Sequence, residues 1–254
     1  MAILLLVIGG LVGAVLLTID CGYRMGIRLR SRNPQRFQSL HPTIDASIFG
    51  LMGLLIAFTF SGAATRFDFR RSLVVQEANA IGTAYLRLDL LPPEKQPELR
   101  EGFRNYVRSR LSVNAAIPDV KAVQAALDRS TALQESIWKK TVEAVEGASP
   151  ADKSLVLANL NEVIDITTTS TAALMTHPPL AVFVMLGLTV LVASMIAGYE
   201  MSLSASRNWV STISFAIVLA SALYMICDYE YPRVGLVRVD PMDRVLMDTL
   251  NQMK

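Results

Sequence analysis

Charge is scarce in this sequence. Of its 254 residues only 18% are charged and 52% are hydrophobic, and 24 basic residues oppose 22 acidic ones for a formal net charge of +2. Soluble domains carry about 25% charged residues, so an ordinary soluble chain is disfavoured. The near-neutral balance excludes an electrostatically driven nucleic-acid binder, and we expect no nucleic-acid partner. The alternation typical of strands is also missing, which favours an all-α protein.

The uncharged residues gather in runs that are long enough to cross a bilayer. These runs lie before Asp20 and at 46–65, 166–199 and 208–227. A spanning helix needs about 20 apolar residues. The first run lacks the basic start of a signal peptide, so we interpret it as a span. We therefore predict four transmembrane helices, at about 2–19, 46–65, 178–199 and 208–227.

Four spans divide the chain into membrane and extramembrane parts. We expect helices 1 and 2 in 1–65, a helical extramembrane domain in 66–177, helices 3 and 4 in 178–227, and a C-terminal tail in 228–254. The protein is then a multi-pass protein of the cell (inner) membrane. Arginines near the span ends are equally frequent on both sides of the membrane, so the positive-inside rule leaves the orientation open.

Cysteine and histidine are too few and too dispersed for most site chemistry. The order of the spans puts Cys21 and Cys227 on opposite sides of the membrane, and it separates His41 from His177 in the same way. We therefore expect no disulfide and no metal site that uses both histidines. Nucleotide-binding and hydrolase motifs are also absent. We predict that the protein is not an enzyme and needs no cofactor.

The second span continues beyond the membrane. Apolar or small residues recur with a spacing of four and three from Ala46 to Leu88, and no proline lies between Thr43 and Leu91. This pattern predicts one long, continuous helix. It is compatible with an ordinary bundle arm or with a helix that lines a symmetry axis.

Three further helices are expected outside the membrane, at 94–113, 119–147 and 151–176. One face of the first carries Arg100, Arg104 and Arg108, which are spaced by four residues. Together with Arg70 and Arg71, this row can give a vestibule a positive potential that favours anions. In the alternative interpretation these arginines form a solvated face, paired at the surface with Glu77, Glu98 and Glu101.

Several segments resemble bestrophins. The stretch LIAFTFSGAATRFDFRRSLV, from Leu55, resembles the end of the second bestrophin transmembrane helix, and LNEVIDITTTSTAALMTHPPLAVF, from Leu160, is similar to the approach to the third. DYEYPRVGLVRVDP, from Asp228, resembles the acidic segment after the fourth span. EANAIGTAYLRLDLLP, from Glu77, resembles the bestrophin-like proteins of bacteria and plants. Bestrophins are pentameric anion channels whose second helix lines the pore.

The resemblance therefore implies a homo-pentameric channel for small ions in the lipid bilayer, of the chloride-conducting type. It places an apolar pore neck at Gly50, Leu54 and Phe58, although side chains at these positions can equally face lipid. Asp228 and Glu230 take the place of the acidic segment and form a weak candidate cation site. The alternative function is a non-conducting structural or interaction protein with the same oligomeric architecture.

Overall fold

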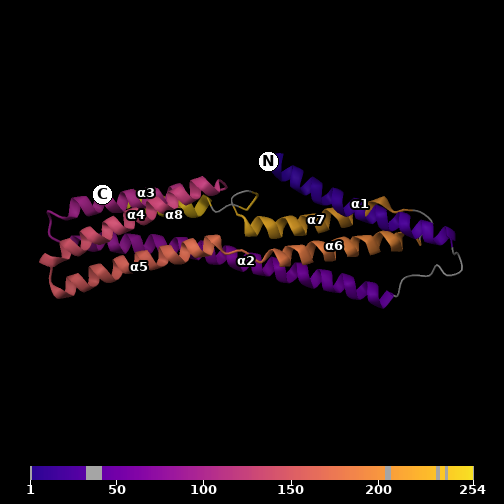
Figure 1. Cartoon of the computed structure of the whole chain (residues 1–254), viewed down its shortest axis with the longest axis horizontal. Helices are drawn as coiled ribbons and strands as arrows, with labels where there is room; N and C mark the ends of the chain where they lie inside the picture. The colour runs from indigo at the N-terminus through magenta and orange to yellow at the C-terminus, as the bar shows by residue number, and fades with distance from the viewer. Residues whose placement is uncertain (1, 33–41, 204–206, 233–234, 238–239, 254) are drawn as a thin grey trace. The chain divides into compact units, whose positions relative to one another are not determined.

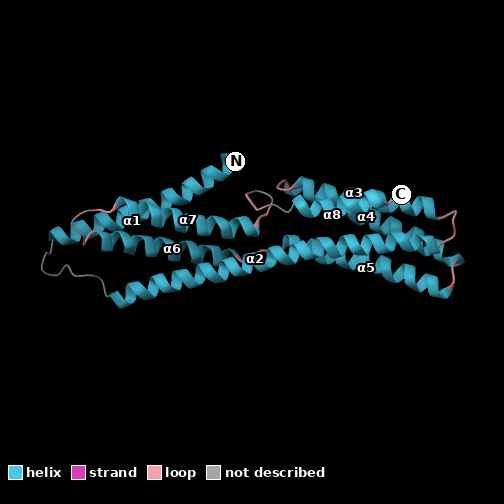
Figure 2. Cartoon of the chain, turned by 180° about the vertical axis from the view of Figure 1, so that it is seen from behind, coloured by secondary structure: helices cyan, strands magenta, loops and turns pink. Residues whose placement is uncertain are grey.

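The computed structural model describes residues 2–32, 42–203, 207–232, 235–237 and 240–253, and every regular element in these ranges is helical. The α-helices are α1 (Ala2–Arg32), α2 (Pro42–Leu86), α3 (Gln96–Ala116), α4 (Val120–Ala144), α5 (Pro150–Met175), α6 (Leu180–Met201), α7 (Trp209–Glu230) and α8 (Asp240–Gln252). Figure 1 colours them in chain order, and Figure 2 shows them from behind. The predicted all-α fold is confirmed, whereas His41 lies outside the described residues.

The chain forms two units. We call the first, residues 1–65 and 177–231, the membrane unit, and the second, residues 66–176 and 232–254, the extramembrane unit, after the parts predicted from the sequence. Four helical stretches are apolar and long enough to cross a membrane, within 6–32, 43–90, 150–201 and 209–230. Each of them overlaps one of the four predicted spans, so the protein is a multi-pass membrane protein.

The membrane unit has its own apolar core, in which α1, α6 and α7 lie side by side. Ile19 from α1, Ala193 from α6 and Ala216 from α7 are fully buried in it, and α2 contributes Met52. Burial within the chain is limited, and many large apolar side chains of these helices remain exposed, as expected for surfaces that face lipid or another subunit.

Glycines bring α1 and α6 into close contact. A methyl group at Gly198 would overlap the backbone carbonyl of Ile19, and one at Gly22 would overlap the carbonyl of Met195. Small residues allow this approach, which dispersion then stabilises. The helix pair therefore depends on glycine at particular positions, whereas Gly9 and Gly187 have no neighbour in the described residues within 4 Å of such a methyl group.

The first helix is longer than predicted. We expected the span to end at Ile19, before the first charge, but α1 continues through Asp20 to Arg32. Asp20 accepts hydrogen bonds from Arg24 Nε at 2.6 Å and from Arg207 Nη1 at 2.7 Å. A charged residue limits an apolar span but not a helix, so α1 continues beyond the predicted span. Cys21 and Cys227 are both free and exposed.

The extramembrane unit is built around the second half of α2. Ile81, Tyr85 and Leu88 are buried there against α3, which contributes Phe103, and against α5, which contributes Leu160. Both views show α3, α4, α5 and α8 alongside this part of α2 (Figures 1 and 2). The core therefore wraps a helix that starts in the membrane unit.

The long second helix is confirmed, and it runs without interruption for 45 residues. Its two halves differ in the burial of the seam, by which we mean the apolar or small residues that recur with a spacing of four and three from Ala46 to Leu88. Residues such as Ile81 and Tyr85 are buried in the extramembrane unit, whereas Gly50, Gly53 and Ala57 are exposed in the membrane unit. The chain's own described helices thus cover the seam only outside the membrane.

Candidate functional site

One side of α2 is uncovered within the membrane unit. Met52 is buried and Ile48 and Ile56 pack against the same core, so these three residues mark the covered side. At about 100° per residue, positions two residues further along lie roughly opposite. Gly50, Leu54 and Phe58, the predicted neck residues, occupy those opposite positions.

The neck residues are accessible in the single chain. Leu54 is 51% exposed and Phe58 68% exposed, and a methyl group built at Gly50 has nothing else of the described chain within 4 Å. The three share one face, as their four-residue spacing requires. The structure leaves this face open to an axis, a neighbouring subunit or lipid, and the neck assignment stays a prediction.

Hydroxyl side chains flank the neck residues on the same helical face. The four are Thr43, Ser47, Ser61 and Thr65, and all are exposed. Ser47 Oγ donates to the carbonyl of Thr43 at 2.7 Å, and Thr65 Oγ1 donates to that of Ser61 at 2.9 Å. In Ser47 and Thr65 the hydroxyl hydrogen is therefore used within the helix, whereas the oxygen can still accept a hydrogen bond from water.

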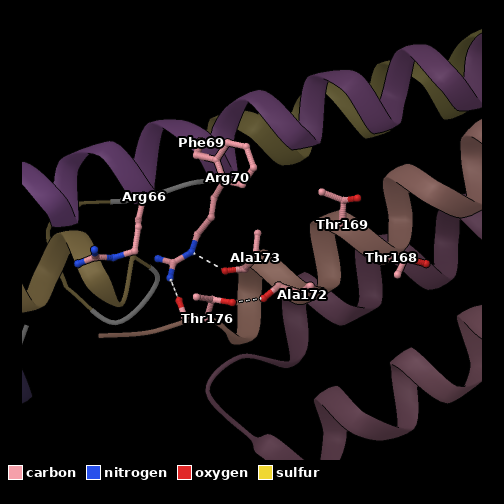
Figure 3. Close-up of a pocket in the computed structure, with 8 residues that line it drawn as sticks. All are labelled: Arg66, Phe69, Arg70, Thr168, Thr169, Ala172, Ala173 and Thr176. Carbon is pink, nitrogen blue, oxygen red and sulfur yellow. Dashed lines mark hydrogen bonds between the residues drawn. The ribbon is translucent and has the colours of Figure 1, made fainter. Parts of the chain in front are cut away.

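The predicted vestibule arginines on α2 have different surroundings. Arg70 donates from Nε to the carbonyl of Ala173 at 3.0 Å and from Nη2 to that of Thr176 at 2.8 Å, so it holds the end of α5 (Figure 3). Arg71 is exposed, lies 3.7 Å from Asp68, and has its guanidinium 5.8 Å from the centre of the Phe67 ring. Arg70 thus has a structural role that the sequence did not indicate.

The arginine row on α3 is largely paired. Arg100 forms an ion pair with Asp89 and lies over the ring of Tyr85. Arg104 and Arg108 both bind Glu101, at 2.9 Å and 3.3 Å. The hydrogen bond from Arg104 holds the pKa of Glu101 below its usual value. The positive potential of this face is therefore reduced by acidic neighbours, and its effect on anions stays a prediction.

The alternative interpretation of the sequence placed Glu77 at the surface as a partner of that row. The structure shows that this placement is wrong. Glu77 is 1% exposed and binds Arg110, with Nε to Oε1 at 2.5 Å and Nη2 to Oε2 at 3.1 Å. Burial disfavours the charged guanidinium, but the Glu77 carboxylate outweighs this effect and the pKa of Arg110 is raised. A buried ion pair therefore links α2 to α3 in the extramembrane unit.

The acidic residues at the end of α7 lie in a buried cluster. Asp228 is 4% exposed and Glu230 1% exposed. His177 Nδ1 lies 2.9 Å from Glu230 Oε1, and the His177 ring stacks on Tyr231 with centroids 4.7 Å apart. In the part of the chain that the structure describes, no group of three or more His, Cys, Asp or Glu residues could hold a metal ion.

A pocket of about 420 Å³ lies between α2 and α5 in the extramembrane unit (Figure 3). It is lined by Arg66, Phe69, Arg70, Thr168, Thr169, Ala172, Ala173 and Thr176. Its α2 wall begins at the first charged residue after the run 46–65, and its α5 wall lies in the uncharged run 166–199. The sequence does not reveal this pocket, because its walls are about a hundred residues apart in the chain.

Comparisons with known proteins identify solved structures that have a similar fold. Two structures of variants of a bacterial bestrophin homologue from Klebsiella pneumoniae superpose with TM-scores of 0.73 and 0.71. The first shares 14% identity and covers 98% of both chains, and the second shares 15% and covers 95% of this chain and 99% of its own. A third structure, of a membrane protein, has a TM-score of 0.71 at 14% identity and covers 96% of this chain and 99% of its own.

Similarity at such identities shows the fold alone. No curated protein sequence matches the chain. The bestrophin-like domain, however, matches residues 9–243, which is nearly the whole sequence. The chain therefore belongs to the bestrophin-like family.

Proposed function

We propose that this protein is one subunit of a homo-pentameric ion channel of the cell membrane. In the assembled channel, α2 of each copy lines a central axis, and rings of Leu54 and Phe58 form an apolar neck next to Gly50. Narrow apolar rings can gate a pore by excluding water rather than by charge. The permeant ions are small anions such as chloride.

The uncovered face of α2 carries this proposal. Its middle is apolar, but hydroxyl residues lie on the same face both before and after Leu54 and Phe58. A purely lipid-facing surface gains nothing from hydroxyl groups, whereas a hydrated axis offers them hydrogen bonds. The sequence of polar, apolar and polar zones along one face is typical of a pore with a central constriction.

The preference for anions is supported by charge at the end of the apolar run. After Asp45 in its first turn, α2 carries no further charge until Arg66, Asp68, Arg70 and Arg71. Positive charge near a pore mouth concentrates anions there. Paired acidic residues such as Glu101 weaken this effect further along the unit, so the charges on α2 are expected to dominate.

The second candidate function is a non-conducting structural or interaction protein. The observation that favours it is the small-residue seam at Gly50, Gly53 and Ala57, which is exposed in the single chain. Such residues allow helices from different subunits to approach closely. In that case the axis is sealed by helix packing, and the oligomer carries no current.

Ion flux through reconstituted protein separates the two functions. Phe58→Ala should raise chloride flux at least about tenfold in liposomes, because it removes an apolar ring from a hydrated axis. Leu188→Ala is the matched control: Leu188 is a comparably exposed apolar residue on α6, so its flux should equal that of the wild type. Reversal potentials in a potassium chloride gradient give the charge selectivity. Equal flux in Phe58→Ala and wild type would favour the non-conducting protein.

A further inference from the structure

Two acidic residues meet at one end of the membrane unit. Asp45 lies in the first turn of α2, and Glu200 lies in the last turn of α6. Ile48, which follows Asp45 by three residues, and Met201, next to Glu200, pack against the same apolar core. Figure 1 shows the start of α2 and the end of α6 at the same end of this unit. The charge of Asp45 accordingly acts on the carboxyl group of Glu200.

Both carboxyl groups contain a buried oxygen that has no hydrogen-bond partner among the described residues. These atoms are Asp45 Oδ2 and Glu200 Oε1. Asp45 is only 9% exposed, and Glu200 is half-buried. Burying a carboxylate without compensation is costly, so buried carboxylates are generally paired with a base, protonated or bound to a metal ion. The two oxygens therefore need a partner that the described chain does not supply.

No basic side chain of the described residues forms an ion pair with either carboxylate. The last turn of α6 contains no basic residue, although a cation at this place would complement the negative end of the helix dipole. Arg207, the next basic residue along the chain, binds Asp20 at 2.7 Å and lies over the ring of Trp209. Glu200 thus combines an unfavourable helix position with a second carboxylate nearby, and a cation would relieve both effects.

The contact between the two residues favours a metal cation over a shared proton. A proton shared by two carboxyl groups forms a hydrogen bond between their oxygens. Asp45 acts on Glu200 through its charge and not through a hydrogen bond. Two carboxylates that interact in this way are suited to a cation that binds an oxygen of each.

We propose that Asp45 and Glu200 together bind a hydrated divalent cation, Mg²⁺ or Ca²⁺. Both are hard cations that prefer carboxylate oxygens, and Mg²⁺ is commonly held by one or two carboxylates with water completing its coordination. The pair is smaller than a group of three protein ligands, which the described residues do not provide. Water and main-chain carbonyls at the end of α6 therefore supply the other ligands. The bound ion links the start of α2 to the end of α6, and this role requires no conduction.

Thermal unfolding of the full-length, chelator-treated protein in detergent tests the proposal. A site with two protein ligands should have a Kd of about 1 mM, so about 10 mM MgCl₂ or CaCl₂ should raise the Tm of the wild type by about 3–5 °C over NaCl of equal ionic strength. Asp45→Asn and Glu200→Gln should each lose this shift, and either variant alone assigns the site. Without divalent cation both variants should be at least as stable as the wild type, because an amide removes the repulsion between two carboxylates.

The control is Glu135→Gln, which removes an exposed carboxylate of α4 and should keep the full shift. A wild type that MgCl₂ and CaCl₂ stabilise no more than NaCl does would overturn the proposal. An equal shift in the wild type and in both amide variants would also overturn it, because the ion would then bind other carboxylates such as Asp228 and Glu230. A wild type that is stabilised by mild acid but not by the cations would assign the pair to a proton instead.

Discussion

At the residue scale, the buried pair Glu77–Arg110 is the feature with the largest expected energetic effect. Both side chains are buried, and two hydrogen bonds join them across 33 residues of sequence. A buried ion pair stabilises the fold little more than a packed apolar pair would. The loss of one partner, however, leaves a buried charge without compensation. Stability should therefore respond far more strongly to a single substitution than to the replacement of both residues.

We predict that Glu77→Gln lowers the free energy of unfolding by about 3–5 kcal/mol, measured by denaturant unfolding in detergent. Glu98→Gln is the matched control, because Glu98 binds Lys140 at the surface, and it should change stability little. The double variant Glu77→Met with Arg110→Met should regain most of the loss. Equal effects of Glu77→Gln and Glu98→Gln would contradict the energetic role of the buried pair.

A second residue-scale prediction concerns Tyr106. Its hydroxyl lies 2.6 Å from Thr167 Oγ1 and accepts from Gln134 Nε2 at 3.0 Å. Thr167 donates its own hydrogen to the carbonyl of Val163, so Tyr106 is the donor to Thr167. Burial, and secondarily the charge of Glu77, raise the pKa of Tyr106 above its ordinary value. The folded state therefore disfavours the tyrosinate.

The sign of the pH effect follows from this raised pKa. Below the unfolded pKa of about 10 the phenol is neutral in both states and its full contribution is present. Above that pH the unfolded state gains by ionisation and the folded state does not, so stability falls as pH rises. We predict that wild type loses stability more steeply than Tyr106→Phe between about pH 9.5 and 11. If the free energies of unfolding from chemical denaturation fall in parallel with pH in wild type and Tyr106→Phe, the phenol does not contribute to the pH dependence of stability.

The arginines of α3 also show what could not be predicted from the sequence. Arg108 and Arg110 are two residues apart and so lie on opposite sides of α3, and Arg108 is exposed whereas Arg110 is buried. Arg110 continues the spacing of the buried Leu99, Phe103 and Tyr106, but the sequence does not show that Glu77 of α2 meets it there. The predicted row was correctly placed on one helix face, but its partners depended on tertiary structure.

At the element scale, the contact between α1 and α6 follows from glycines whose importance differs by position. We predict that Gly198→Ala lowers the free energy of unfolding by about 1–3 kcal/mol, because the added methyl overlaps the backbone of Ile19. Gly187→Ala, on the same helix, should be neutral or slightly stabilising because nothing lies near it in the described chain. Thermal unfolding in detergent measures both variants. A harmless Gly198→Ala would mean that the helices can move apart without cost.

The helices themselves were largely predictable, because runs of uncharged residues and prolines mark where they begin and end. Two elements differed. Helix α1 extends beyond Ile19, where Asp20 binds Arg24 on the same helix and Arg207, which is 187 residues away in sequence. Helix α8, in the predicted tail, has a clear apolar face with Leu246 buried. That signal was present in the sequence at helical spacing and was missed.

At the scale of the whole molecule, some exposed apolar side chains lie outside the predicted spans, so contact with lipid does not explain their exposure. In the extramembrane unit, Val120 is 80% exposed, and Trp138 and Val142 on the same helix, α4, are 37% and 39% exposed. Trp138 and Val142 are four residues apart and share one face. Water-exposed apolar residues grouped on a helix are typical of interaction surfaces. A neighbouring subunit of the proposed oligomer is the natural partner for this face.

We predict that native mass spectrometry in mild detergent gives a mass of five subunits for the wild type. Trp138→Glu should shift the distribution towards monomers, because a charge in a desolvated contact is costly and aromatic residues often dominate interface energies. Lys139→Glu changes the neighbouring, exposed residue and should leave the pentamer intact. A wild type that is only monomeric would remove the basis for a shared axis. A pentamer unaffected by Trp138→Glu would place the interface on the membrane helices instead, where the small-residue face of α2 at Gly50 and Gly53 is the next candidate.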